Sequence, residues 1–229
     1  KTDKTEALYS TPYAIEPIDA ALLKGWNDSP IDAALKLPPL NPYIAEKLDL
    51  KADALTPAIP EVVMDDPGLK VWHQIDPSFA VPRAFISVSF HTKKANESLK
   101  TRVQNIMFAT LLRDALEAKN YVLSDAGVAV SVGSAWSGLN LGVSGYDEKQ
   151  PLLLQELCEL VRNFTVDSAR FKLEKSQMIR NWRNRLKARP YHQGLWALNE
   201  VVQGESIDFQ KAADVLDTLT ADELAQFVA

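Results

Sequence analysis

Residues 127–146 read Gly-Val-Ala-Val-Ser-Val-Gly-Ser-Ala-Trp-Ser-Gly-Leu-Asn-Leu-Gly-Val-Ser-Gly-Tyr, and this stretch decides the fold. Apolar residues alternate with small or polar ones in two runs, Val128/Val130/Val132 and Leu139/Leu141/Val143. A period of two is what a strand with one buried face requires. Five of the nine glycines lie between Gly127 and Gly145, and glycine allows the tight turn of a hairpin. The stretch therefore predicts an antiparallel β-hairpin.

Two further alternating segments precede this hairpin, at residues 69–75 and 83–91. The turn sequence Asp76-Pro-Ser stands between them, so we expect these two strands to pair with each other. Residues 96–120 are apolar nearly all round in their second half, which is typical of a helix that is covered on most sides. We expect it to be the core helix.

Several helices are predicted after the hairpin. Asp147 is a candidate N-cap for the first of them, whose apolar stripe is Leu153, Leu157, Leu160, Val161 and Phe164. The second helix begins at Thr165 and ends near Arg189-Pro190, because the residue before a proline avoids helical geometry. Its expected buried stripe is Phe171, Met178, Trp182 and Leu186. A helix over residues 191–202 follows, and the capping box Thr220-Ala-Asp-Glu223 opens a last one.

The first third of the chain differs in character, because eleven of the thirteen prolines lie at or before Pro82. Proline fixes φ and removes a backbone donor, so we expect extended connector with one short helix at residues 19–26. The order of elements is then two strands, a helix, two strands and several helices. This order predicts an α+β fold in which helices cover one face of an antiparallel sheet.

The composition argues against several classes of protein. A formal net charge of −5 and a pI near 5.3 do not suit a surface built to neutralise nucleic-acid phosphates, so no nucleic acid is expected as a partner. No apolar run approaches the roughly 20 residues that span a bilayer, so no membrane partner is expected either. The single cysteine, Cys158, cannot form an internal disulfide. It lies beside the apolar stripe of its helix, and we expect it to be packed and inert.

Motifs for metal, nucleophilic or phosphate chemistry are missing. The three histidines, His73, His91 and His192, belong to neither His-Glu-x-x-His nor His-x-x-Glu-His. His73 and His91 could face each other across the first predicted hairpin, but the alternation places them on its solvent side. Ser144-Gly-Tyr is not a Gly-x-Ser-x-Gly elbow, and the nearby glycines form no phosphate-binding loop. We therefore predict no catalytic, metal-binding or cofactor-binding residue.

One charged segment is uneven, since residues 170–189 hold eight basic side chains against the single acid Glu174. Five of the basic residues are closely spaced: Arg180, Arg183, Arg185, Lys187 and Arg189. The structural interpretation is a solvated helix face whose aliphatic stems cover apolar surface. The functional interpretation is a positive wall that contacts acidic peptide segments or a partner domain.

Four segments in register resemble the middle of the insulinase/pitrilysin family of zinc metalloproteases. They are Tyr9-Ser-Thr-Pro-Tyr13, Leu37-Pro-Pro-Leu-Asn-Pro-Tyr-Ile44, Leu69–Phe79 together with Pro82-Arg-Ala84, and Gly145-Tyr-Asp-Glu-Lys-Gln150. Their order and spacing match from about Tyr9 to the end of the chain. Residues 118–127 also look like the family's segment between core helix and hairpin.

The resemblance implies a parent of four related α+β domains, with the LuxS/mitochondrial-processing-peptidase-like metallohydrolase fold, that enclose a chamber for peptides and small proteins. Zinc is bound in the first domain, so we expect zinc in the parent enzyme and no cofactor in this chain. Residues 1–66 resemble the tail of the second domain with a Pro-rich connector. Residues 67–229 resemble the third domain without its last strand. The expected partners are the other domains of the same polypeptide and the parent's peptide substrates.

We expect both ends of the chain to be cut rather than natural, since the first residue is Lys1 and the last helical pattern stops at Ala229. The main hypothesis is therefore a non-catalytic chamber-wall fragment of a zinc endopeptidase. One alternative is a peptide-binding module that uses the basic helix. Another is a piece of a parent that has lost its zinc ligands and serves as a structural or processing subunit. By family analogy we expect the periplasm, with the cytoplasm as the alternative.

Overall fold

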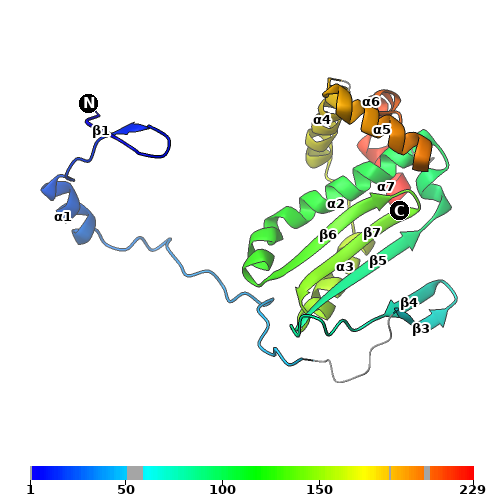
Figure 1. Ribbon diagram of the computed structural model, residues 1–229, viewed down its shortest axis with the longest axis horizontal. Helices are drawn as coiled ribbons and strands as arrows, with labels where there is room; N and C mark the ends of the chain where they lie inside the picture. The colour runs from blue at the N-terminus through cyan, green and yellow to red at the C-terminus, as the bar shows by residue number, and fades with distance from the viewer. Residues whose placement is uncertain (1, 51–58, 186, 204–206) are drawn as a thin grey trace. The chain divides into compact units, whose positions relative to one another are not determined.

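The predicted hairpin forms two strands of a three-stranded antiparallel sheet (Figure 1). In the sheet, β7 (Gly138–Tyr146) lies between β5 (Arg83–His91) and β6 (Val128–Ala135). The pairing of β6 with β7 extends from Val128↔Gly145 to Ala135↔Gly138, so the hairpin is confirmed. The computed structural model describes residues 2–50, 59–185, 187–203 and 207–229.

Two glycines of β7 hold backbone conformations that side chains rarely adopt. The φ angle is 149° at Gly138 and 113° at Gly145. A Cβ at Gly138 would come closer than 3.0 Å to the backbone of Phe90. A Cβ at Gly145 would come closer than 3.0 Å to the backbone of Gly127 and of Val128. Both ends of β7 are therefore places where only glycine lets the neighbouring backbone approach.

The predicted pairing of residues 69–75 with 83–91 is wrong. Strand β4 (Leu69–His73) pairs instead with β3 (Glu61–Asp66), and β5 pairs with β7. The turn between β3 and β4 is Pro67-Gly68, and the φ of Gly68 is 86°, which suits the second central position of a type II turn. Closing this two-residue loop orders fewer residues than closing the loop over 74–82 would.

The same pairing separates two histidines that could have faced each other across the predicted hairpin. His73 lies opposite Glu61 in the β3–β4 ladder, whereas His91 lies opposite Gly138 in the three-stranded sheet.

Helices α2 (Leu99–Asp125) and α3 (Gln150–Arg162) cover one face of the three-stranded sheet. They form its main core with β6 and β7. Its buried side chains include Ala109, Leu112, Leu116, Leu123, Val128, Val132, Leu139, Leu141, Val143, Leu153 and Leu157. The α+β fold class with helices on one face is confirmed. On the other face of the sheet the side chain of Phe85 stays 71% exposed.

Helix α2 extends beyond the predicted range of 96–120, to Asp125. It begins at a capping box, in which Ser98 and Thr101 bond each other's backbone N–H. It ends where Gly127, with φ 67°, takes the left-handed conformation that commonly follows a helix.

Two expectations for α3 are wrong. The N-cap position falls on Lys149, because the turn at Asp147 is closed through the backbone, with the Gln150 N–H donating to the Asp147 carbonyl at 3.2 Å. Cys158 is exposed, since it lies one residue past the buried Leu157 and so about 100° around the helix.

A second core forms where α4 (Ser168–Arg185), α6 (Phe209–Thr218) and α7 (Ala221–Val228) pack on the N-terminal half of α2. Its buried residues are Val103, Met107, Leu111, Phe171, Met178, Ile179, Trp182, Ala212, Ala213, Leu216, Leu219 and Leu224. Three of the four residues predicted for the stripe of α4 are among them, and the fourth, Leu186, lies outside the described residues.

The ends of these helices follow local capping. Helix α4 begins at Ser168, not at Thr165, because the Asp167 carboxylate accepts the N–H groups of Ala169 and Arg170 at 2.7 and 2.9 Å. The capping box at Thr220 and Glu223 is confirmed. Lys100 bonds the same Glu223 carboxylate, and together these contacts lower its pKa to about 2. Helix α5 (Pro190–Gln203) follows α4 with the predicted bounds nearly unchanged.

The chain divides into two units, Lys1–Leu40 and Asn41–Ala229. The first unit holds a short ladder of β1 (Lys4–Thr5) with β2 (Pro12–Tyr13) and helix α1 (Ala20–Asp28). Asp19 caps α1 through the N–H groups of Ala21 and Leu22, as expected for a helix near residues 19–26.

Candidate functional site

The three histidines lie in different elements of the structure. His73 and His91 belong to separate ladders, and the ring of His192 lies 4.1 Å from that of Tyr191 and 5.9 Å from that of Trp196. In the described part of the chain, no three His, Cys, Asp or Glu side chains come together as a metal site would need. These donors do not fit the zinc that the resemblance implies for the parent.

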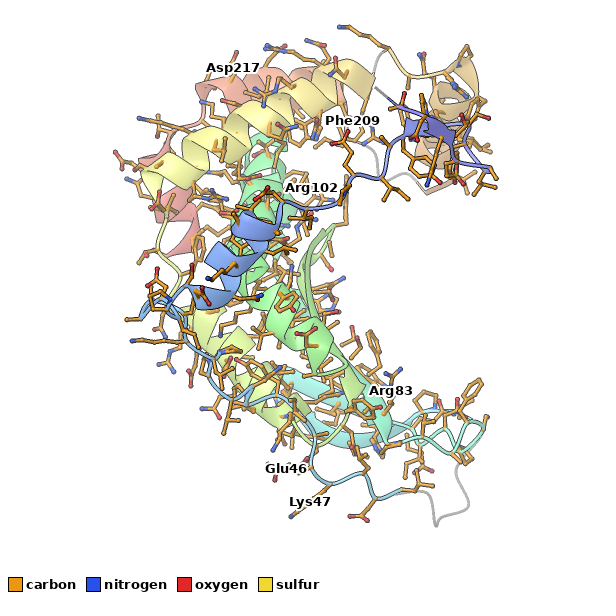
Figure 2. All side chains as sticks on the ribbon, turned by 90° about the vertical axis from the view of Figure 1, so that its left-hand side faces the viewer. Glu46, Lys47, Arg83, Arg102, Phe209 and Asp217 are labelled. Atoms are coloured by element: carbon orange, nitrogen blue, oxygen red, sulfur yellow. The ribbon has the colours of Figure 1, made fainter. Side chains whose placement is uncertain are left out.

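Two of the five closely spaced basic residues are held by neighbouring helices. Arg183 forms ion pairs with Asp217 at 3.2 Å and Asp214 at 3.6 Å, both on α6. The guanidinium of Arg185 lies over the rings of Phe209 and Trp196, at 3.9 and 4.2 Å from their centroids. Figure 2 labels Phe209 and Asp217 on the helix that receives both arginines. These contacts join α4 to α5 and α6.

The electrostatics of Arg185 fit this packed position. Its burial lowers the pKa of the guanidinium, because leaving water penalises the charged form. Arg185 therefore has a packing role between the rings of Trp196 and Phe209. This agrees with the structural interpretation of the basic segment, in which basic side chains cover apolar surface.

The other three basic residues remain exposed. Arg180 donates to the side chain of Gln177 on its own helix at 2.6 Å. Lys187 and Arg189 lie after the end of α4, where the Lys187 N–H donates to the Asn184 carbonyl in a turn. The five residues thus do not form one continuous helix face.

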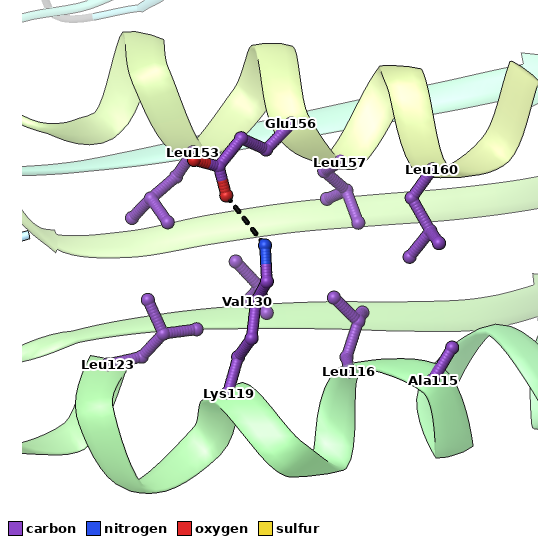
Figure 3. Close-up of a pocket in the computed structure, with 9 residues that line it drawn as sticks. All are labelled: Ala115, Leu116, Lys119, Leu123, Val130, Leu153, Glu156, Leu157 and Leu160. Atoms are coloured by element: carbon purple, nitrogen blue, oxygen red, sulfur yellow. Dashed lines mark hydrogen bonds and ion pairs between the residues drawn. The ribbon is translucent and has the colours of Figure 1, made fainter. Parts of the chain in front are cut away.

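A small cavity of about 70 Å³ lies between α2 and α3 (Figure 3). Leucine, alanine and valine side chains line it: Ala115, Leu116, Leu123, Val130, Leu153, Leu157 and Leu160. An ion pair between Lys119 and Glu156, at 2.9 Å, crosses the space between the two helices. The hydroxyl of Tyr43 donates to the same Glu156 oxygen at 2.8 Å.

The charges at this cavity are set by their mutual contacts. Burial raises the pKa of Glu156, but the hydrogen bonds from Lys119 and Tyr43 outweigh it and hold the pKa below its usual range. Burial and the adjacent carboxylate raise the pKa of Tyr43. The sequence reasoning did not identify this cluster. The available signal was Tyr43, an aromatic residue within the proline-rich stretch for which extended connector is expected.

The sequence and the fold of this chain are similar to those of known proteins. Residues 1–215 match the family model described as the middle or third domain of peptidase M16. The chain belongs to the peptidase M16 family. Among the proteins similar to this M16 chain is insulin-degrading enzyme-like 1, peroxisomal, of Arabidopsis thaliana, with 29% identity over 228 residues. Human insulin-degrading enzyme is 28% identical over 231 residues.

The M16 chain is covered completely in these matches but spans only 24% of the Arabidopsis protein and 22% of the human one. The crystal structure of pitrilysin matches 100% of this chain with a TM-score of 0.80 and 24% sequence identity, and the match takes up 24% of that structure. The expected insulinase/pitrilysin-family membership and fold are confirmed. Within the described ranges, no helix of this M16 chain has the length and apolar character to cross a membrane.

Proposed function

We propose that this chain is a non-catalytic middle segment of a longer zinc metalloendopeptidase that degrades peptides and small proteins. The match of residues 1–215 to the M16 middle domain carries this proposal. Under this proposal, the zinc and its ligands belong to another domain of the parent. This chain forms part of the chamber wall and makes contacts with other domains. Its partners are the other domains of the same polypeptide and the peptides that the parent cleaves.

Exposed aromatic side chains support the packing role. Trp72 on β4, Phe79 in the following loop and Phe85 on β5 are 58%, 79% and 71% exposed. Large apolar surface that stays open to water is typical of interaction sites. Contact with other domains of the parent would remove these side chains from water.

The purified chain should not hydrolyse a quenched fluorogenic peptide when zinc is added. The reason is that none of the described residues offers a three-ligand site that could activate water. Fluorescence increase over time is the measurement, with a chelator-treated sample as the control. Zinc-dependent turnover that copurifies with the chain on two different columns would show that this segment is itself catalytic.

A second candidate function is peptide binding by the basic residues Arg180, Arg183, Arg185, Lys187 and Arg189. The observation in its favour is that Arg180, Lys187 and Arg189 remain exposed. Arg183 is a poor test position, because its replacement would also break the ion pairs to α6. The informative variants therefore change Lys187 and Arg189.

The double charge reversal Lys187→Glu with Arg189→Glu should weaken binding of a labelled acidic peptide about tenfold, if this surface binds peptides, since each exposed pair contributes up to about 1 kcal/mol. Fluorescence anisotropy at low salt measures the affinity. Lys172→Glu, on the exposed side of α4, is the matched control. Equal affinities of wild type and double variant would remove this second candidate.

We propose residues 1–66 as the connector and preceding-domain tail, and residues 67–229 as the third domain. Residue 66 is the last residue of β3, while the division of the structure into units comes after Leu40.

For the compartment we propose the periplasm, with the cytoplasm as the alternative. The Arabidopsis relative carries the word peroxisomal in its name. A parent without zinc ligands stays the third candidate. Finding His-x-x-Glu-His in the upstream reading frame would exclude it.

A further inference from the structure

A short segment of the proposed connector, Asn41–Lys47, is bound to the helical layer by side-chain contacts over long sequence distances. Its first contact is at the C-terminal end of α2. The Asn41 side chain donates from Nδ2 to the Val122 carbonyl at 2.7 Å, and its Oδ1 accepts the Tyr43 N–H at 3.0 Å. One amide thus closes a local turn and ties that turn to a residue 81 positions away.

Tyr43 makes the second contact. Its side chain is 7% exposed and belongs to the core cluster beneath α2 and α3. Its hydroxyl donates to Glu156 on α3. Lys119 from α2 bonds the same oxygen, and Figure 3 shows this second interaction. A buried ring with a satisfied hydroxyl therefore fixes the segment to both helices at once.

Glu148, just before α3, makes the third contact. Its Oε2 accepts the N–H groups of Glu46 and Lys47 at 2.5 and 3.0 Å. Figure 2 labels Glu46 and Lys47 on this part of the chain. The two backbone bonds lower the pKa of Glu148, because they favour the ionised carboxylate. Both ends of Asn41–Lys47 are thus held, with Tyr43 between them.

We propose that Asn41–Lys47 is an anchor that fixes the connector on α2 and α3 and resists local release of this part of the backbone. The division of the structure after Leu40 agrees with the proposal, since the anchor begins at the next residue and belongs to the unit that contains α2 and α3. The anchor also gives a role to the Asn41-Pro-Tyr43 part of the resemblance motif. It is a property of this chain and does not depend on peptidase activity in the parent.

Limited trypsin digestion of the full chain tests the anchor with an internal standard. The bonds Lys36–Leu37 and Lys47–Leu48 have the same residues on both sides of the cut, and both lysines are exposed. A protease needs local release of the backbone that it cleaves. With each rate divided by that of the same bond in the unfolded chain, we expect cutting after Lys47 to be at least about tenfold slower than after Lys36, since several hydrogen bonds must open. Equal normalised rates at the two bonds would overturn the proposal.

Substitutions separate the anchor from general stability. Glu148→Gln and the pair Tyr43→Phe with Glu156→Gln should each speed cleavage after Lys47 about fivefold or more and leave cleavage after Lys36 unchanged. Tyr121→Phe on α2 and Glu159→Gln on α3 are matched controls, because both side chains are exposed and neither takes part in the three contacts described above. If the anchor variants keep the native ratio of the two rates, the contacts do not hold the connector.

Hydrogen exchange on the unmodified chain is a second measurement that needs no variant. The amides of Tyr43, Glu46 and Lys47 should exchange at least about tenfold more slowly than that of Lys36, for which exchange is expected to be near the unprotected rate. Exchange of all four at one rate would overturn the proposal, whatever the variants show.

Discussion

Gly145→Ala is expected to lower the free energy of unfolding of the sheet-containing unit by about 2–6 kcal/mol. A non-glycine residue in such a backbone conformation costs about 1–3 kcal/mol, and the φ of Gly145 is 113°. The new methyl group would also meet the backbone of Gly127 and Val128, neither of which can turn aside as a side chain could. Overpacking of this kind adds about 1–3 kcal/mol.

Gly133→Ala is the matched control, because Gly133 lies in the neighbouring strand and no heavy atom stands within 4 Å of its added Cβ. Its effect should be under about 1 kcal/mol in either direction. Urea unfolding followed by circular dichroism gives both values. If the two substitutions have equal effects, the close approach of β7 to the backbone of Gly127 and Val128 is not the reason that position 145 requires glycine.

Trp182→Ala should also lower the free energy of unfolding by about 3–5 kcal/mol, the cost of emptying a large buried aromatic site. Trp182 is 7% exposed and its ring packs edge-on against that of Phe209, with 6.0 Å between centroids. The cavity would open between α4 and α6, next to the contacts of Arg183 and Arg185. We therefore expect the substitution to weaken the packing of α4 on α6, in addition to removing the buried apolar surface of the Trp182 ring.

Trp72→Ala is the comparison for that substitution, since Trp72 is 58% exposed on β4 in the same unit. It should cost less than about 1 kcal/mol. Thermal unfolding in a calorimeter measures both variants against wild type. A loss of less than about 1 kcal/mol for Trp182→Ala would mean that α4 is not part of the cooperative core.

Local patterns were enough to predict the parts of the fold that depend on near neighbours. The alternation in residues 128–143 and the capping box at Thr220 both act within a few residues, and both are confirmed. The partner of β5 could not be predicted in this way, because its pairing with β7 joins residues far apart in the sequence, from His91↔Gly138 to Arg83↔Tyr146. The sequence did contain the turn signal Pro67-Gly68. The alternating pattern of residues 83–91 nevertheless led to the prediction that β4 pairs with β5, on the other side of β4 from its true partner β3.

The basic segment shows a similar limit. Its charge pattern identified Arg183 and Arg185 as members of one face, but their positions are decided by Asp217 and Phe209 on a helix later in the chain. The cluster of Tyr43, Lys119 and Glu156 was missed for the same reason. Its three residues come from the connector, α2 and α3, and no local sequence pattern marks any of them as a contact residue.

Helix α2 serves both cores: its N-terminal half packs with α4, α6 and α7, and its C-terminal half packs on the sheet with α3. Insertion or deletion of one residue near its middle would turn one half against the other by about 100°. No repacking of a single core could then satisfy both sets of neighbours. Length variation in related chains should therefore collect in the loops, while α2 tolerates substitution but keeps its number of residues between the two cores.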